Sequence, residues 1–140
     1  MYLLDSSAIA IMLGKLRERA TEILKDKVTL DLANYELGNI IWKECVLKRR
    51  IDVKEAVSRA EKLAKILEIL RIEKIKSEAD FKETMELAAT LKLTFYDASY
   101  LYVAKSKKLT LVTDDKELNE KAKQANIESK TVNQLLKTIP

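Results

Sequence analysis

Histidine is absent from the 140 residues of this chain. Its absence excludes the Ser-His-Asp triad, the Cys-His pair, zinc sites that use histidine, and RNA cleavage by a pair of histidines. Any hydrolytic chemistry in this chain must therefore use carboxylates, metal ions, lysine, tyrosine or serine.

Cysteine, glycine and proline are scarce as well. Cys45 is the only cysteine, so an intramolecular disulfide and a zinc site built from cysteines are excluded. The apolar helical pattern around Cys45 predicts a reduced thiol in the core. With 2 glycines and 1 proline the chain has no flexible linker or low-complexity stretch, and its length suits one hydrophobic core. We therefore expect residues 1–140 to form a single domain.

Long hydrophobic runs are also lacking. The apolar segment from Ala8 to Leu13 is too short to span a membrane, and no basic region precedes it as in a signal peptide. Burial against a sheet explains this segment as well as a role in a dimer or partner interface. The net charge of +4 is small for a protein that binds polyanions. The sequence predicts a cytoplasmic protein that does not contact a membrane.

The hydrophobic pattern alternates between short strands and helices. Short apolar segments predict strands at 1–4, 28–32, 69–72, 109–113 and 127–129. Because parallel strands need crossover connections, usually helices, this alternation predicts a three-layer α/β sandwich with a mainly parallel sheet of about five strands flanked by helices. Apolar residues spaced by three and four predict helices over 7–13, 16–25, 34–49, 52–68, 78–91, 96–107, 115–125 and 131–137.

Four acidic residues fall at the edge where such a sheet binds its ligands. Asp5 ends the first predicted strand, and Glu36 lies in the first turn of the helix after the second strand. Asp115 directly follows the fourth strand. Asp97 begins the helix that leads into the fourth strand, so this helix must run antiparallel to the strands and place Asp97 at their carboxyl ends. Ligands bind beyond that edge in open α/β sheets.

Helix capping offers a structural explanation for the same residues, because Asp and Glu favour the first turn of a helix. Asp97 could complete a capping box with Thr94. For the next helix, Asp114 and Glu117 supply a capping box, so we expect Asp114 to cap it and Asp115 to stay free. Asp97 and Asp115 both head apolar helical stripes. Their carboxylates are therefore predicted to point inward, which is costly unless something compensates the charge.

A cluster of carboxylates in one pocket favours a divalent cation. Without a cation the carboxylates would repel each other and raise their own pKa values. Mg²⁺ prefers oxygen ligands and needs only one or two carboxylates beside water and a substrate phosphate. Such a site suits phosphodiester hydrolysis, in which one ion activates the attacking water and a second could stabilise the leaving oxygen.

Short motifs surround each of the four acidic residues. They are Asp5-Ser6-Ser7-Ala8-Ile9, Glu36-Leu37-Gly38-Asn39, Tyr96-Asp97-Ala98-Ser99-Tyr100 followed by Val103-Ala104, and Leu111-Val112-Thr113-Asp114-Asp115. In this order and spacing, the motifs resemble those of PIN domains, and especially of the VapC toxins of VapBC toxin–antitoxin pairs. The resemblance covers essentially the whole chain and implies a PIN-like fold.

The same resemblance implies an activity and partners. Similar proteins are metal-dependent endoribonucleases that form dimers and cleave structured RNA. They are silenced by a small antitoxin, VapB-like, whose peptide enters the active groove. The resemblance implies that the ligands for Mg²⁺ or Mn²⁺ are Asp5, Glu36, Asp97 and Asp115.

Two hydroxyl residues and one further carboxylate accompany these ligands. The resemblance implies that Ser7 and Thr113 hydrogen-bond the carboxylates or a metal-bound water. The family's last acidic residue follows a threonine by two positions, which selects Asp115. Asp114 stays open as a further ligand.

Basic and aromatic side chains could contact RNA. Lys43 follows Glu36 by seven residues on the same helical face and is the best placed of the lysines. A solvated helix surface is favoured for the basic residues, and packing in or around the core is favoured for the tyrosines. The other candidates are Lys48-Arg49-Arg50, Lys105 with Lys107-Lys108, and Tyr96, Tyr100 and Tyr102.

Two other α/β families with acidic residues at strand ends fit the sequence poorly. A receiver domain needs an Asp that closes the third strand, where this chain has Glu73-Lys74. A haloacid-type phosphatase needs a second Asp at the position of Ser7. Two alternatives stay open: a PIN nuclease of RNA maturation that has no antitoxin, and a non-catalytic PIN-like module that binds RNA or protein. The inward carboxylates favour catalysis over the binding module.

Overall fold

The computed structural model of the chain describes residues 1–140 and contains a five-stranded parallel sheet. The strand order is β3-β2-β1-β4-β5, and β1 lies at the centre, with Leu3 paired to Val28 on one side and to Leu111 on the other. The predicted α/β class and parallel sheet are confirmed. The strands are β1 (Tyr2–Leu4), β2 (Val28–Leu30), β3 (Arg71–Glu73), β4 (Thr110–Val112) and β5 (Ser129–Lys130).

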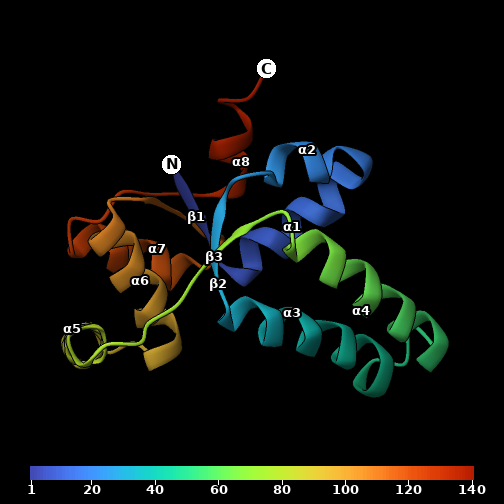
Figure 1. The fold of residues 1–140 in the computed structure, drawn as a ribbon, viewed down its shortest axis with the longest axis horizontal. Helices are drawn as coiled ribbons and strands as arrows, with labels where there is room; N and C mark the ends of the chain where they lie inside the picture. Colours follow the sequence, from blue (N-terminus) through green and yellow to red (C-terminus); the bar gives the residue numbers. More distant parts are fainter.

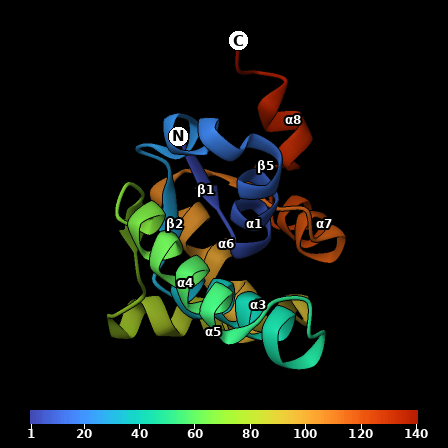
Figure 2. The ribbon, with the colours of Figure 1, turned by 90° about the vertical axis from the view of Figure 1, so that its right-hand side faces the viewer.

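Helices cover both faces of this sheet (Figure 1). One layer contains α1 to α4, and the opposite layer contains α5, α6 and α7. In Figures 1 and 2, α3 and α4 lie side by side as a hairpin that extends beyond the strands. The helices are α1 (Ser6–Leu16), α2 (Ala20–Leu24), α3 (Leu32–Trp42), α4 (Val53–Leu67), α5 (Glu78–Leu91), α6 (Phe95–Lys107), α7 (Lys116–Gln124) and α8 (Val132–Leu136).

Alternation along the strands divides the hydrophobic core into two clusters. Successive side chains of a strand point to opposite faces. Leu4 therefore packs with Ile9 and Met12 of α1, whereas Leu3 packs with Leu101 of α6 and Leu118 of α7. All six of these side chains are at most 1% exposed. The two clusters fix α1, α6 and α7 against the sheet, and these helices begin next to the carboxyl ends of the strands.

The apolar segment from Ala8 to Leu13 forms most of α1. Ala8, Ile9 and Met12 are fully buried in the core, which supports packing against the sheet as the main role of the segment. No helix of the chain combines the length and the apolar character that crossing a membrane requires.

Several predicted boundaries differ from the structure for local reasons. The third strand begins two residues late, because the N–H groups of Ile69 and Leu70 donate to Ile66 and Leu67 and prolong the end of α4. The fifth strand is likewise displaced, because the N–H of Ile127 donates to Ala122 at the end of α7.

Two predicted helices are also built differently. The helix expected over 16–25 is interrupted after Leu16, where Arg17 adopts a positive φ of 47° and a 3₁₀ turn separates α1 from α2. Leu32, expected in a strand, begins α3, since the side chain of Asp31 accepts the N–H of Leu32. The hairpin continues from α3 in a π-helical turn over Lys43–Leu47, which leaves Cys45 half-buried and outside both core clusters.

Candidate active site at the carboxyl edge of the sheet

Asp5 is the most buried carboxylate at this edge, with 5% of its surface exposed. It follows β1 and caps α1, because its Oδ1 accepts the N–H of Ala8 at 2.8 Å. The hydroxyl of Ser7 donates to the same oxygen at 2.7 Å, and the hydroxyl of Thr113 donates to Oδ2. Burial raises the pKa of Asp5, and these hydrogen bonds oppose the rise without cancelling it.

Thr113 connects Asp5 to the next strand end. It follows β4, whose Val112 pairs with Leu4 immediately before Asp5, and its side chain is fully buried. Its hydroxyl donates to Asp5 and accepts the N–H of Asp115 at 3.1 Å. One hydroxyl thus fixes the Asp5 carboxylate and the backbone that carries Asp115 relative to each other.

Glu36 lies on α3 and reaches across to α6. It is half-buried, and its Oε1 accepts a 2.8 Å hydrogen bond from the hydroxyl of Tyr100. Tyr100 was expected to pack in or around the core, and its contact with Glu36 was not predicted. A signal was present, because Tyr100 follows Asp97 by three residues and therefore lies on the same face of α6.

Asp97 lies in the first turn of α6, where its backbone N–H donates to the side chain of Thr94 at 3.1 Å. The capping box is incomplete, because no hydrogen bond or ion pair engages the Asp97 carboxylate. Its pKa is raised to about 6, first by burial and then by the charges of Asp115, Glu36 and Asp5. Carboxylates from four separate segments therefore share one electrostatic environment, as the topology predicted.

The capping roles of Asp114 and Asp115 differ from those expected from the sequence. Asp115 caps α7, with its Oδ1 accepting the N–H of Leu118 at 3.1 Å, whereas Asp114 accepts the N–H of Val132 at the start of α8 at 2.8 Å. The prediction that Asp114 caps this helix is wrong, because α7 begins at Lys116 and the cap position falls on Asp115. Asp115 is also exposed, in contrast to the predicted inward orientation.

The charges at this edge are not neutralised within the chain. The three ion pairs of the structure all lie on α4 or at the tip of the α3–α4 hairpin, and none includes Asp5, Glu36, Asp97 or Asp115. No three carboxylates are arranged so that together they could hold one metal ion directly. Mg²⁺ can be held by one or two carboxylates and several waters, so this donor set fits such an ion.

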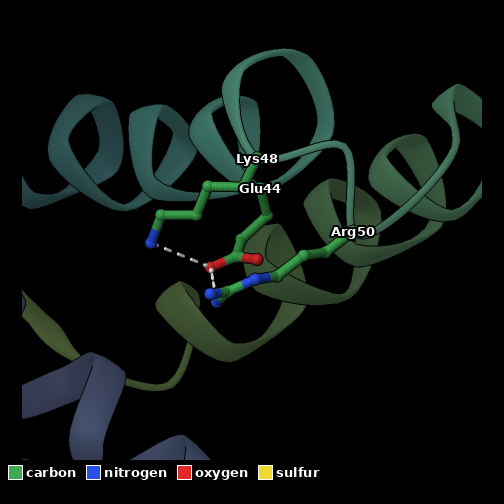
Figure 3. A network of polar contacts seen from close by, with 3 residues as sticks. All are labelled: Glu44, Lys48 and Arg50. Carbon is green, nitrogen blue, oxygen red and sulfur yellow. Dashed lines mark hydrogen bonds and ion pairs between the residues drawn. The ribbon is translucent and has the colours of Figure 1, made fainter.

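The predicted basic contacts do not gather around these carboxylates. Lys43 is exposed near the far end of α3. Lys48 and Arg50 both approach Glu44, at 3.4 and 3.5 Å, at the tip of the hairpin (Figure 3). The basic run in 105–108 lies at the carboxyl end of α6, about 15 Å along the helix axis from Asp97.

The three tyrosines of α6 have separate environments. Tyr100 and Tyr102 are buried, at 1% and 8% exposure, and the hydroxyl of Tyr102 donates to Asp80 at the start of α5. Tyr96 is 62% exposed and directly precedes Asp97. Core packing is therefore confirmed for two of them, and Tyr96 alone is free to contact a substrate.

Comparison with known proteins agrees with this arrangement. The PIN domain family matches residues 2–124. The chain is similar to the exonuclease VapC9 of Pyrobaculum aerophilum, with 36% identity over 124 residues that cover 89% of this chain and 87% of the relative. It is also similar to the ribonuclease VapC3 of the same organism, with 33% identity over 123 residues that cover 84% of this chain and 91% of the relative.

A solved structure supports the same conclusion. The crystal structure of PAE2754 from Pyrobaculum aerophilum is 32% identical in sequence and matches with a TM-score of 0.76 over 96% of this chain and 91% of that one. The family match extends over most of the chain and includes the segments that carry all four carboxylates. The chain therefore belongs to the PIN-domain family.

Proposed function

We propose that this chain is a metal-dependent endoribonuclease and the toxin of a VapBC-type pair. The observation that carries the proposal is the crowding of carboxylates around Asp97, whose pKa of about 6 reflects burial and four neighbouring acidic residues. A divalent cation would remove this repulsion. Two relatives, the exonuclease VapC9 and the ribonuclease VapC3, support nuclease chemistry.

The metal would be Mg²⁺ or Mn²⁺, held by Asp5, Glu36, Asp97 and Asp115 directly or through water. When bound, such an ion polarises the phosphodiester and increases the acidity of water. Asp97 is the carboxylate most available to the ion, because it has no other partner. Asp115 uses Oδ1 to cap α7 and keeps Oδ2 for the site.

The remaining side chains orient the ligands. Ser7 and Thr113 donate to different oxygens of Asp5, so its carboxylate is held in one orientation before the ion binds. This preorganisation reduces the rearrangement needed on binding. The exposed ring of Tyr96 beside Asp97 is suited to stack on an RNA base.

Cleavage of RNA is the direct test. The purified chain is incubated with an RNA labelled at one end, with Mn²⁺, with Mg²⁺ or with EDTA, beside Asp5→Asn and Asp97→Asn. We expect internal fragments with either metal, none with EDTA, and a loss of at least about 100-fold in both variants. Mononucleotides released only from an end would instead identify an exonuclease. No cleavage by folded protein would favour the non-catalytic binding module.

A groove between α1, α3 and α4 supports an antitoxin partner. It has a volume of about 410 Å³ and an apolar floor that includes Leu13, Leu37 and Ile66, and its rim carries Arg17 and Lys62. Apolar lining with basic residues at the rim suits an amphipathic acidic segment. We further propose that the chain acts in the cytoplasm as a homodimer, for which the exposed apolar side chains of α5 offer a surface.

The partner proposal has its own test. A small acidic protein encoded next to this chain's gene should bind the chain and inhibit cleavage. Ile40→Glu, in the groove at a position 40% exposed, should abolish the inhibition and leave cleavage unchanged. If no neighbouring protein binds, the alternative of an RNA-maturation nuclease without an antitoxin is favoured.

A further inference from the structure

The hydroxyl of Tyr100 lies inside the protein directly against a carboxylate of the candidate site. The residue is 1% exposed, and its ring is fixed within the core cluster that contains Leu101 and Leu118. The hydroxyl donates to Glu36 Oε1 at 2.8 Å across a separation of 64 residues. A rigid aromatic donor on α6 therefore contacts a flexible acidic side chain on α3.

The orientation of the Glu36 carboxylate depends on this one hydrogen bond, whereas Asp5 and Asp115 are oriented by other contacts. Asp5 and Asp115 each cap a helix, so backbone N–H groups orient them. Glu36 lies beyond the first residues of α3, where Asp31 is the cap, and no ion pair includes it. Tyr100 is its only hydrogen-bond partner from another element of the fold. A free glutamate side chain would otherwise sample many rotamers.

The hydrogen bond from Tyr100 occupies only part of the Glu36 carboxylate. A phenol that donates to Oε1 leaves Oε2 and the second lone pair of Oε1 free for another partner.

We propose that Tyr100 is a positioning residue that holds Glu36 toward the metal at the carboxyl edge. This inference rests on the proposed metal-dependent function. Tyr100 does not touch the metal or the substrate, and it acts through Glu36 alone. The arrangement corresponds to an outer-shell hydrogen bond that keeps a metal ligand in its binding orientation.

Tyr102 provides a matched control on the same helix. Its hydroxyl also donates to a carboxylate, that of Asp80, and it is also buried. Asp80 also accepts the N–H groups of Lys76 and Ser77 and completes the capping box of α5, away from the four acidic residues. Tyr102→Phe therefore removes the same chemical group without affecting Glu36.

The test is a double-mutant cycle on Mn²⁺ affinity, measured from free Mn²⁺ by electron paramagnetic resonance with no RNA present. Circular dichroism first confirms that each variant is folded. We expect Tyr100→Phe to weaken Mn²⁺ binding about tenfold and Tyr102→Phe less than about twofold. In the Glu36→Gln background, we expect Tyr100→Phe to add less than about twofold, because its effect passes through the carboxylate.

Three results would overturn the inference while leaving the proposed function in place. The first is wild-type Mn²⁺ affinity in Tyr100→Phe. The second is the same weakening by Tyr100→Phe whether position 36 carries Glu or Gln, and the third is the same weakening by Tyr102→Phe. The second and third would reflect general loosening of α6. A wild-type chain that binds no Mn²⁺ would instead contradict the proposed function and the inference with it.

Discussion

Asp97 bears an energetic cost in the metal-free protein. Its pKa of about 6 exceeds the usual 3.8, so folding opposes its ionisation. Below pH 3.8 the group is protonated in the folded and the unfolded chain and adds no cost. As the pH rises, the unfolded chain releases this proton near pH 3.8 and the folded chain only near pH 6. The free energy of unfolding falls over this range, and the full cost is present once the pH has passed through 6.

Asp97→Asn should therefore stabilise the metal-free protein at pH 8. We expect the free energy of unfolding to rise by about 1 kcal/mol, because solvent at this partly exposed side chain screens most of the cost that the full shift would imply. The gain should disappear near pH 4. Urea unfolding in EDTA at the two pH values measures both effects. An equal gain at pH 4 and pH 8 would show that charge is not its cause.

Thr113 is the residue that joins two strand ends through one hydroxyl. Thr113→Val removes the donor to Asp5 and the acceptor of the Asp115 N–H, and leaves buried polar groups without partners. We expect the free energy of unfolding to fall by about 1–3 kcal/mol. Thr113→Ser keeps the hydroxyl, loses only a methyl group and should be less destabilising. Urea unfolding that ranks Val at or above Ser would refute this role.

At the scale of elements, Asp115 at the start of α7 has two roles, because it caps the helix and is also a proposed metal ligand. Asn can cap a helix as well as Asp, but it lacks the charge. Asp115→Asn should therefore leave the free energy of unfolding unchanged and weaken Mn²⁺ binding. Asp115→Ala should weaken Mn²⁺ binding as well and lower the free energy of unfolding by about 1 kcal/mol. Thermal unfolding and Mn²⁺ titration of both variants separate the two roles. Equal stability of the Asn and Ala variants would argue against capping.

Asp114 links the end of β4 to α8. Its carboxylate accepts the N–H of Val132, whose side chain is fully buried with Leu135 in the core. Asp114→Ala should lower the free energy of unfolding by about 1 kcal/mol and leave Mn²⁺ affinity within about twofold. Asp114→Asn keeps an acceptor and serves as the control. A loss of Mn²⁺ affinity as large as that of Asp115→Asn would make Asp114 a metal ligand.

Most elements could be predicted from periodicity, because apolar residues spaced by three and four mark the helices between the strands. The buried faces were less predictable, since Val53 and Val57 of α4 and Phe81 and Met85 of α5 are exposed. The errors lie at element ends, where the outcome depends on single hydrogen bonds. The expected strand at Ile69 became a turn because α4 continues through 3₁₀-type bonds. The cap of α7 moved from Asp114 to Asp115 because the helix begins one residue later than predicted.

At the scale of the whole molecule, topology predicted the site better than local pattern did. Asp5, Glu36, Asp97 and Asp115 come from four segments, and the parallel order of the strands is sufficient to place them on one edge. The spacing of three residues from Asp97 could place Tyr100 on the face of α6 that carries Asp97, but not its contact with Glu36. That contact depends on how α3 and α6, on opposite faces of the sheet, approach each other at that edge.

The central claim, that uncompensated carboxylates at this edge hold a divalent cation, is tested most directly by comparing the stability of the wild type and Asp97→Asn at pH 8 with and without Mn²⁺. Without Mn²⁺ the variant should be the more stable by about 1 kcal/mol. At Mn²⁺ about 100 times above its Kd, the wild type should gain about 2.7 kcal/mol and the variant little, so that the order of stability reverses. Equal gains for both proteins, or none for either, would contradict the account.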